Sequence, residues 1–218
     1  ITVSEATKEA VLKEASWFDP QKITVIPTVV PQHFKPRNTE PNNRKPIALH
    51  IGVAENKNLC RHAEALRSLD IHLRIIGEPS DADHSTLKQL GVEYSTQSKL
   101  TDAEMQEAYA TSDLLLFAST LEGFGMPILE AQMVGLPVIT SHIAPMNEVA
   151  GDGALLCDPL DCNAIRGCIE RVTSNAQLRT SLIQKGTANC RRFSPEESAR
   201  MMQQLYMKMK NENAHAQP

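Results

Sequence analysis

The chain of 218 residues has no long apolar run and no excess of positive charge. A membrane-spanning helix needs roughly 20 consecutive apolar residues, and no segment approaches that length. The formal net charge of -4 gives no overall basic field, which argues against nucleic acid as a partner. The first residues do not resemble a signal peptide.

Paired cysteine and histidine spacings typical of metal sites are also absent from the sequence. None of the seven histidines stands four residues from another. The cysteines are odd in number and irregularly spaced, at Cys60, Cys157, Cys162, Cys168 and Cys190. We therefore expect no metal site, and we expect reduced, mostly buried thiols.

Apolar runs that predict strands alternate with segments of helical spacing through most of the chain. Strands are predicted at 47–51, 71–76, 92–94, 113–118, 138–140 and 154–157. Helices are predicted at 59–66, 85–90 and 101–110, and again from 126 onward. This alternation indicates an α/β fold: a Rossmann-like parallel sheet with helices on both faces.

The two ends of the chain have a different pattern from the middle. Helices are expected from Ser4 to about residue 15, at 161–172, at 175–189 and at 194–210, with a short strand at 23–26. The last helix carries apolar residues on one face, which favours packing against the body of the protein over a membrane or partner surface. The proline-rich and asparagine-rich stretch between these parts has the composition of a linker.

The most informative segment is 122–130, which reads Glu-Gly-Phe-Gly-Met-Pro-Ile-Leu-Glu. It follows the apolar run 114–117, so it predicts a strand, a glycine-rich loop and then a helix. Gly123 and Gly125 permit positive φ and close approach of the backbone to a ligand. Pro127 suits the first helical turn. The amides of such a helix N-terminus favour an anion, and a diphosphate fits that place.

Two carboxylates bracket this loop. Glu130 could turn back from the first helical turn towards a ribose diol, and Glu122 could accept hydrogen bonds from sugar hydroxyls. A purely structural interpretation makes the glycines a tight connection and Glu130 a complement to the helix dipole. The two acids at this spacing favour a nucleotide-sugar site, because ligands of open parallel sheets bind at the carboxyl ends of the strands.

Segment 122–130 resembles the E-x7-E signature of the retaining glycosyltransferases of family 4, group 1, which have the GT-B fold. The resemblance covers nearly the whole chain. Segments 4–8 and 23–27 are similar to the family's interdomain junction, and segment 52–58 is similar to its phosphate loop. Segments 141–154 and 158–159 are similar to a downstream block of the family, and segment 193–197 is similar to the start of its crossover helix.

The resemblance implies a division of labour between two domains. In this family the C-terminal Rossmann-like domain binds the nucleotide-sugar donor, the N-terminal domain binds the acceptor, and transfer occurs in the cleft between them. The chain resembles the donor domain with flanking parts: a remnant of the acceptor domain and the junction at 1–27, a linker at 28–46, the donor domain at 47–193, the crossover helix at 194–210 and a disordered tail at 211–218. Because the chain begins with Ile1, we expect it to be a fragment.

The function so implied is that of the donor-binding half of a hexosyltransferase. The full enzyme would move a hexose from a UDP- or GDP-sugar to a hydroxyl acceptor in the synthesis of a glycan, a lipopolysaccharide or another glycoconjugate. The resemblance implies no cofactor and no metal, and the missing N-terminal domain would hold the acceptor. The fragment alone is expected to be inactive. A cytoplasmic location is expected, and peripheral contact of the missing half with the inner face of a membrane stays open.

Site roles carry over from the resemblance residue by residue. Glu130 would hold the ribose, and Glu122 would hold the donor sugar together with the backbone of Phe124 and Gly125. The residues expected to bind the donor are Gly52, Lys57, Ser119, Glu122, Gly123, Phe124, Gly125, Met126, Pro127, Ile128 and Glu130. Nucleobase contacts are expected from backbone near 94–100.

The diphosphate would be held by backbone and by one lysine. The N–H groups of Met126 and Ile128 would approach it, and Lys57 would neutralise the leaving group. Lys57 and Glu122 are therefore the catalytic candidates. Taken without this context, Lys57 is more often a surface lysine. Many relatives carry arginine where this chain has Val53, so one phosphate-binding cation is absent or supplied from elsewhere.

Three alternatives compete with this interpretation. Asp81 and Asp83 have the Asp-x-Asp spacing of a metal site in the other large glycosyltransferase fold. Capping of the following helix is the favoured explanation for these two acids. A nucleotide-sugar epimerase on a related fold would need further acids and histidines in the cleft. A non-catalytic nucleotide-sugar binding module is modestly supported by Val53 and by the lone domain.

Overall fold

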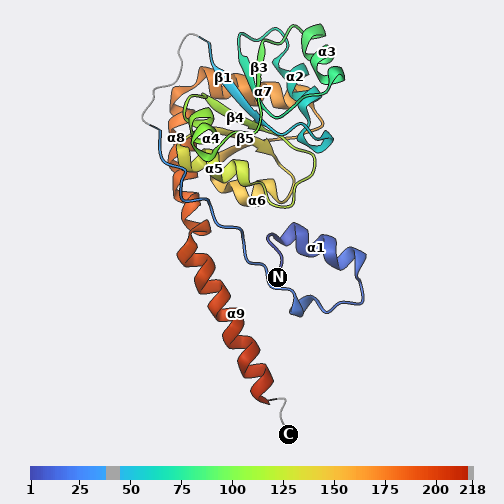
Figure 1. Ribbon diagram of the computed structural model, residues 1–218, viewed down its shortest axis with the longest axis vertical. Helices are drawn as coiled ribbons and strands as arrows, with labels where there is room; N and C mark the ends of the chain where they lie inside the picture. Colours follow the sequence, from blue (N-terminus) through green and yellow to red (C-terminus); the bar gives the residue numbers. More distant parts are fainter. Residues whose placement is uncertain (38–44, 216–218) are drawn as a thin grey trace.

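The computed structural model describes residues 1–37 and 45–215, and it contains one six-stranded parallel sheet (Figure 1). The strand order is β3-β2-β1-β4-β5-β6, and every neighbouring pair is parallel. The strands are β1 (Ile47–Ile51), β2 (His72–Ile76), β3 (Tyr94–Gln97), β4 (Leu114–Phe117), β5 (Val138–Ser141) and β6 (Ala154–Cys157). The predicted Rossmann-like fold is confirmed.

Helices cover both faces of the sheet, and each face has its own apolar core. One core packs α2 (Leu59–Leu66), α3 (Asp81–Gln89) and α7 (Cys162–Ser174) on the sheet. The other packs α4 (Asp102–Ala110), α5 (Met126–Val134) and α6 (Met146–Ala150). Helix α8 (Ala176–Asn189) contacts α5 and α7.

The period of two along each strand distributes the side chains between these cores. Ala48 of β1 pairs in register with Leu114 of β4, and both belong to the first core. The next pair, Leu49 and Leu115, belongs to the second core. Because both faces are covered, these strands are continuous apolar runs and lack the alternation of a half-exposed sheet.

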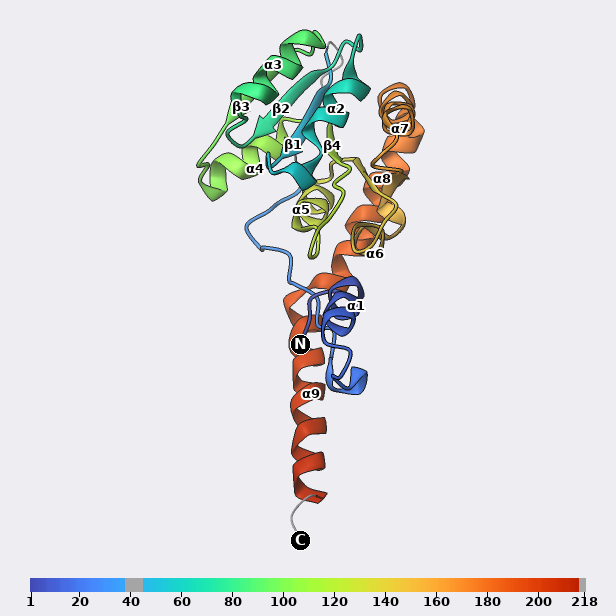
Figure 2. The same cartoon turned by 90° about the vertical axis from the view of Figure 1, so that its right-hand side faces the viewer.

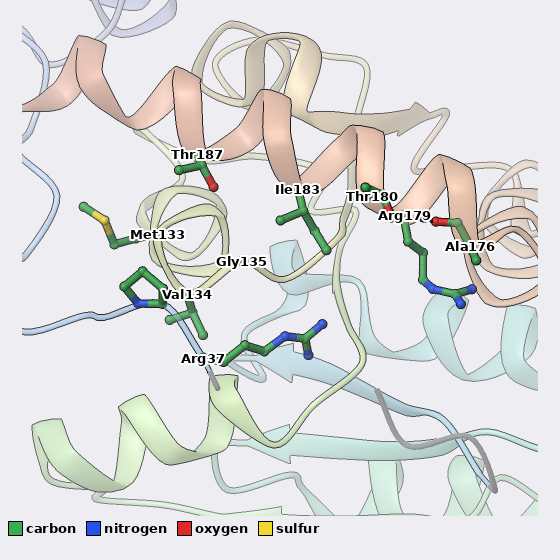
Figure 3. A pocket seen from close by; sticks show the side chains of 10 residues that line it. Arg37, Met133, Val134, Gly135, Ala176, Arg179, Thr180, Ile183 and Thr187 are labelled. Carbon is green, nitrogen blue, oxygen red and sulfur yellow. Dashed lines mark hydrogen bonds between the residues drawn. The ribbon is translucent and has the colours of Figure 1, made fainter. Parts of the chain in front are cut away.

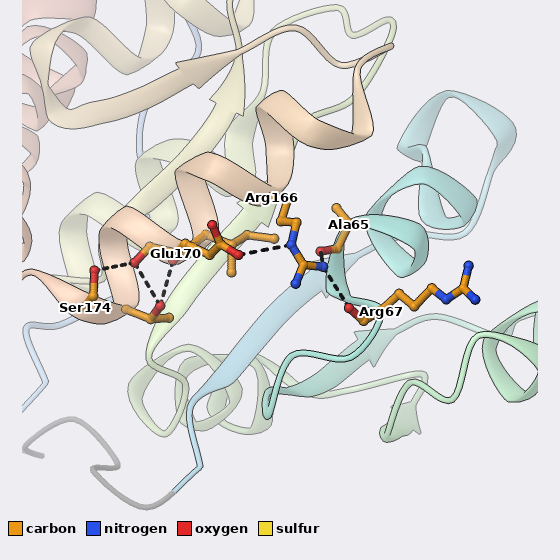
Figure 4. A network of polar contacts seen from close by, with 7 residues as sticks. Ala65, Arg67, Arg166, Glu170 and Ser174 are labelled. Atoms are coloured by element: carbon orange, nitrogen blue, oxygen red, sulfur yellow. Dashed lines mark hydrogen bonds and ion pairs between the residues drawn. The ribbon is translucent and has the colours of Figure 1, made fainter.

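Polar contacts join the helices at the edges of each layer. Arg166 of α7 pairs with Glu170 at 3.0 Å and donates to the carbonyls of Ala65 and Arg67 at the end of α2 (Figure 4). Ser174, at the end of the same helix, returns a hydrogen bond to the carbonyl of Glu170. One side chain thus satisfies the C-terminal carbonyls of α2 and fixes how α7 lies against it.

Several predicted element boundaries are wrong. Helix α3 begins at Asp81 and not at 85, because Ser80 and Asp83 form a capping box. The strand predicted at 23–26 is reduced to one bridge between Thr2 and Val25. The third strand lies at 94–97, two residues later than predicted, and the short helix α6 was not predicted.

The capping interpretation is confirmed for Asp83 at the start of α3, and Asp81 is the other acidic residue of that first turn. The Asp83 carboxylate accepts from the backbone N–H of Ser80 at 2.9 Å and from its hydroxyl at 2.7 Å. The Ser80 hydroxyl in turn accepts from the Asp83 N–H. Two orphan donors of the helix end are satisfied in this way, so Asp83 has a local structural role.

Both terminal segments lie outside the sheet layers. Helix α9 (Pro195–His215) runs away from the sheet, and α1 (Glu5–Glu14) lies on the same side of the domain (Figures 1 and 2). Tyr206 and Met209 of α9 are 62% and 49% exposed, so its apolar face does not pack against the body as predicted. The helix also passes residue 210, where its end was predicted. Parts of the predicted linker and tail, 38–44 and 216–218, lie outside the described residues.

The cysteines are free, and three of them are buried: Cys157, Cys168 and Cys190. The expectation of mostly buried thiols is confirmed. Across residues 1–37 and 45–215, no cluster of three metal-ligating side chains occurs. Among the same residues, no helix has the length and apolar composition needed to cross a membrane.

Candidate functional site

The candidate site lies where β1 and β4, the central strands, reach their carboxyl ends. After β1 the chain turns at Gly52, whose φ is +86°, and enters a short 3-10 helix at Glu55–Lys57. A Cβ on Gly52 would lie 3.0 Å from two carbons of the Lys57 side chain. Glycine is required here twice, for the left-handed conformation and for the space that the lysine stem occupies.

Lys57 and Glu122 meet at this edge of the sheet. The Lys57 Nζ lies 2.6 Å from Glu122 Oε1, and the two side chains are 20% and 12% exposed. The same Nζ lies 4.9 Å from the centre of the Phe117 ring at the end of β4. The predicted catalytic pair is therefore brought together in a partly desolvated position, where a charge-assisted hydrogen bond is strong.

Two asparagines hold the two loops in register. Asn56 donates its side chain to the carbonyl of Leu121, and its own carbonyl accepts the N–H of Thr120. Asn58 is buried in the left-handed conformation and donates to the carbonyls of Ala118 and Pro159. The sequence analysis did not identify these asparagines. Asparagine tolerates a positive φ, and its side-chain amide can donate two hydrogen bonds. The residue type is therefore the only local signal at these two positions.

Helix α5 begins at the glycine-rich loop as predicted. Gly125 is its N-cap with φ +109°, and Pro127 is in the first turn. The prediction of positive φ holds for Gly125 but not for Gly123. The Ile128 N–H donates to the Gly125 carbonyl at 3.0 Å, and the Ile128 side chain is fully buried. The expectation that the amides of Met126 and Ile128 approach a diphosphate stays a prediction.

The carbonyl of Gly123 is held by the N-terminal segment of the chain. The hydroxyls of Ser4 and Thr7 each donate to it at 3.0 Å. Ser4 is also the N-cap of α1 and accepts the Thr7 N–H. Phe124, the next residue in the loop, turns its ring into the core against Phe193 at 5.7 Å. The loop is thus fixed from outside by α1 and from inside by an aromatic pair.

Glu130 lies half-buried in α5, with its carboxylate towards α4. The Tyr109 hydroxyl donates to Glu130 Oε2 at 2.6 Å. Burial raises the pKa of Glu130, and the hydrogen bond from Tyr109 acts in the opposite direction. The sequence analysis missed Tyr109, because nothing in its local pattern indicates a contact 21 residues away.

Two buried histidines lie between β1 and α2, close to the loop that follows β1. His50 of β1 and His62 of α2 share a hydrogen bond between their Nδ1 atoms at 2.9 Å. Burial lowers the pKa of His50 to about 4 and lowers that of His62 well below its ordinary value. Both rings are therefore neutral at pH 7. Ser119 follows Ala118 in the chain. Its hydroxyl is buried and has no hydrogen-bond partner among the described residues.

Val53 stands at the position where the family resemblance led us to expect a cation. Its side chain packs against the first core, and a Cβ on Gly77 would meet Val53 Cγ1 at 2.8 Å. Position 53 therefore contributes apolar packing between the turns that follow β1 and β2. Lys57 is left as the cation that faces Glu122.

A separate hollow of about 470 Å³ lies at the opposite end of α5 (Figure 3). Gly135, which ends α5, lines it together with Arg37 and Arg179. The Arg37 side chain donates to the Ser112 carbonyl, and Arg179 donates to the carbonyls of Val172 and Thr173. Both arginines donate to backbone carbonyls, and the hollow lies at the end of α5 that is distant from the glycine-rich loop. It is therefore not part of the candidate site.

Comparison with known families decides the identity of the fold. Residues 31–189 match the profile of the family described as "Glycosyl transferases group 1". The chain belongs to the group 1 glycosyl transferases. Its sheet and flanking helices are those of the C-terminal domain of GT-B glycosyltransferases. Members of this family generally work without a metal ion.

Individual group 1 glycosyl transferases resemble this chain over most of its length. It is 36% identical over 162 residues to the O-antigen chain mannosyltransferase B of Escherichia coli, which is 68% of this chain and 42% of that protein. A glycosyltransferase from Rickettsia africae superposes with a TM-score of 0.83 at 22% identity, covering 94% of this chain and 62% of that one.

One of the similar solved structures carries ligands. The structure of HepE from Anabaena, in complex with UDP and glucose, superposes with a TM-score of 0.75 at 17% identity. The match covers 96% of this chain and 62% of that one. Overall, this group 1 chain spans about half the length of the curated relatives that it matches.

Proposed function

We propose that this chain is the donor-binding half of a retaining glycosyltransferase. The full enzyme transfers a hexose from a nucleoside-diphosphate sugar to a hydroxyl acceptor in glycan, lipopolysaccharide or other glycoconjugate synthesis. The O-antigen mannosyltransferase among its relatives supports this class of product. The HepE complex with UDP and glucose supports a nucleotide-sugar donor.

The observation that carries the proposal is the meeting of Lys57 and Glu122 beside the start of α5. A cation, a carboxylate and a helix N-terminus are the three groups that a sugar diphosphate needs. The diphosphate takes the Met126 amide and Lys57, and the sugar hydroxyls take Glu122. Glu130, eight residues further along the chain, takes the ribose, and backbone near 94–100 faces the nucleobase.

The chemical contribution of this half is stabilisation of the leaving group. As the bond to the anomeric carbon breaks, negative charge grows on the diphosphate oxygen. Lys57 Nζ and the N-terminus of α5 are fixed, partly desolvated donors for that charge, and they need little reorganisation. The acceptor comes from a domain that the chain does not include, so this chain alone is expected to bind donor without transferring it.

Calorimetry of the purified chain with a panel of UDP-, GDP- and ADP-sugars tests this function. We expect one nucleotide to bind clearly better than the others, and we expect Glu130→Ala to weaken it about 10-fold or more, the usual effect of a lost hydrogen bond to a charged group. Binding of none of them, together with no effect of Glu130→Ala, would remove the donor-site proposal. Robust transfer by the chain alone would remove the two-domain argument.

Val53 supports one alternative, a nucleotide-sugar binding module without catalysis. With valine at that position, a single lysine faces the diphosphate, and in this structure it is paired with Glu122. The two functions are separated by supplying the acceptor-binding domain that the proposed enzyme requires. Restored transfer supports the enzyme, and undiminished binding without transfer supports the module.

A further inference from the structure

Tyr109 stands outside the loop and helix that form the proposed donor site. It is the penultimate residue of α4, which lies beside α5 on one face of the sheet (Figures 1 and 2). Its side chain is completely buried, and its ring makes an edge contact with Phe34 at 5.4 Å. The hydroxyl is its one polar group, and a buried tyrosine hydroxyl needs a partner.

The partner of that hydroxyl is a carboxylate oxygen of Glu130. The oxygen–oxygen distance of 2.6 Å is that of a charge-assisted hydrogen bond. Among the described residues, no other group donates to the Glu130 carboxylate. Tyr109 therefore occupies Oε2, and Oε1 has no donor within the described part of the chain.

If the Tyr109 hydroxyl donated to a backbone carbonyl, the hydrogen bond would need no explanation beyond pairing a buried polar group. The acceptor is instead one of the two acids that bracket the donor loop. Burial raises the pKa of Glu130, and a donated hydrogen bond favours its ionised form. Burial and the Glu130 charge raise the pKa of Tyr109, so the phenol keeps its proton and remains a donor. An ionised carboxylate only accepts hydrogen bonds, and it accepts those of ribose hydroxyls more strongly than a neutral acid does.

We propose that Tyr109 is a positioning residue for recognition of the nucleotide ribose: it fixes one oxygen of Glu130 and thereby aims the other at the ribose hydroxyls. This inference rests on the proposed donor function. A carboxylate held by a rigid, buried phenol loses little conformational freedom when the ligand arrives, and such preorganisation raises affinity and specificity. The sugar of the nucleotide, and not its base, is then what Tyr109 helps to select.

The test is the preference of the chain for ribonucleotides over deoxyribonucleotides. Dissociation constants are measured by calorimetry for UDP and GDP and for their 2′-deoxy and 3′-deoxy forms, with the wild-type chain and with Tyr109→Phe. We expect the wild type to prefer the ribose form, and we expect Tyr109→Phe to reduce that preference about 10-fold, with little change in affinity for the form that lacks the recognised hydroxyl.

A matched control is Thr173→Val. Thr173 is a half-buried residue of α7 whose hydroxyl donates to the Ile169 carbonyl at 2.9 Å, on the opposite face of the sheet from Tyr109. The substitution also removes a hydrogen-bonded hydroxyl without changing shape. We expect it to lower thermal stability and to leave the ribose preference unchanged. An equal loss of preference in both variants would assign the effect of Tyr109→Phe to general loosening and overturn the inference.

The outcomes separate this inference from the function beneath it. If the wild type has no ribose preference and Glu130→Gln changes nothing, the proposed role of Glu130 fails. If the wild type prefers the ribose form and Glu130→Gln loses that preference, but Tyr109→Phe keeps it in full, only the role of Tyr109 fails.

Should Tyr109→Phe not fold, labelling of the wild-type chain with 3-fluorotyrosine gives an independent answer. The chain has three tyrosines, so the fluorine spectrum is simple to assign. We expect the Tyr109 resonance to shift more with the ribonucleotide than with its deoxy form. Equal shifts with both ligands would overturn the inference.

Discussion

Lys57 and Glu122 are 65 residues apart in the sequence, and their side chains form an ion pair with 2.6 Å between Nζ and Oε1. The pair joins the loop after β1 to the loop after β4, the two central strands of the sheet. Each partner is also proposed to bind a different part of the donor. Arrival of a diphosphate therefore competes for Lys57, and arrival of a sugar competes for Glu122.

Lys57→Ala is expected to weaken binding of a nucleoside diphosphate about 10- to 100-fold, because a hydrogen bond between charged groups is lost. The remaining affinity should also depend less on salt. Calorimetry at two salt concentrations measures both effects. Lys185→Ala, at an exposed position on α8, is the control and should change neither. Unchanged affinity in Lys57→Ala would show that the diphosphate lies elsewhere.

Glu122→Gln is expected to separate sugar binding from diphosphate binding. The carboxylate is close to the site of the diphosphate charge and is proposed to accept sugar hydroxyls, so its loss removes a repulsion and an attraction together. Affinity for the free nucleoside diphosphate should stay equal or rise, while affinity for the nucleotide sugar should fall several-fold. A parallel fall for both ligands would contradict the assignment of Glu122 to the sugar.

Stability should fall as the pH drops below about 6.5, because of His50 and His62. The folded-state pKa of His50 is lowered by burial to about 4, and that of His62 is lowered in the same direction. The unfolded chain therefore binds more protons between about pH 4 and 6.5, so the stability present above that window is lost within it. For His50 alone the loss is on the order of 3 kcal/mol.

Urea titrations between pH 7.5 and 4.5 measure this dependence. The double variant His50→Leu/His62→Leu removes both groups and should flatten the decline. His142→Gln, at an exposed position, should leave it in place. A decline of the same slope in the double variant would assign it to other groups.

Two glycines should respond in opposite ways to alanine. A Cβ on Gly153 would lie 2.4 Å from the backbone Cα of Gly186 in α8, so Gly153→Ala should destabilise the fold by about 2 kcal/mol or more through overpacking. Gly167, inside α7, has nothing within 4 Å of such a Cβ. Gly167→Ala should stabilise by roughly 0.5–1 kcal/mol through helix propensity. Thermal melts of the two variants decide whether this packing is correct.

Thr7→Val should loosen the donor loop without unfolding it. The substitution keeps the shape of the side chain and the Ser4 cap of α1 but removes the hydroxyl that donates to the Gly123 carbonyl. Net loss of one such bond is worth about 1 kcal/mol. Amide exchange at 123–125 should accelerate, and nucleotide-sugar affinity should fall a few-fold. Thr180→Val, on α8, serves as the control, and equal exchange in both variants would argue against a role for α1.

The pattern of local signals predicted the central elements well. The helix at 59–66 and the strand at 154–157 have the predicted bounds, and the helix predicted at 101–110 starts from a capping box of Thr101 and Glu104. In each case the information lies within a few residues, in caps and in apolar runs. At the start of α9, Ser194 and Glu197 have the spacing of a capping box, but only the bond from the Glu197 N–H to the Ser194 hydroxyl forms, because the Glu197 carboxylate pairs with Arg200.

Caps and apolar runs did not predict the contacts between segments that are distant in the sequence. The strand expected at 23–26 has the right residues, but among residues 1–37 and 45–215 it has no neighbouring strand and forms one bridge, between Val25 and Thr2. The apolar face of α9 was expected to be covered, and it is exposed in this chain. Strand pairing and burial both depend on partners that a local window does not contain.

The sequence by itself determined the order of strands and helices, the glycine-rich turn before α5 and the positions of Glu122, Glu130 and Lys57, because periodicity and caps are local. Only the tertiary structure decided what those residues touch. It pairs Lys57 with Glu122, sets Tyr109 on Glu130, and leaves the Ile128 amide bonded within the loop. These contacts arise where parallel strands end side by side, and that proximity exists only after the sheet has formed.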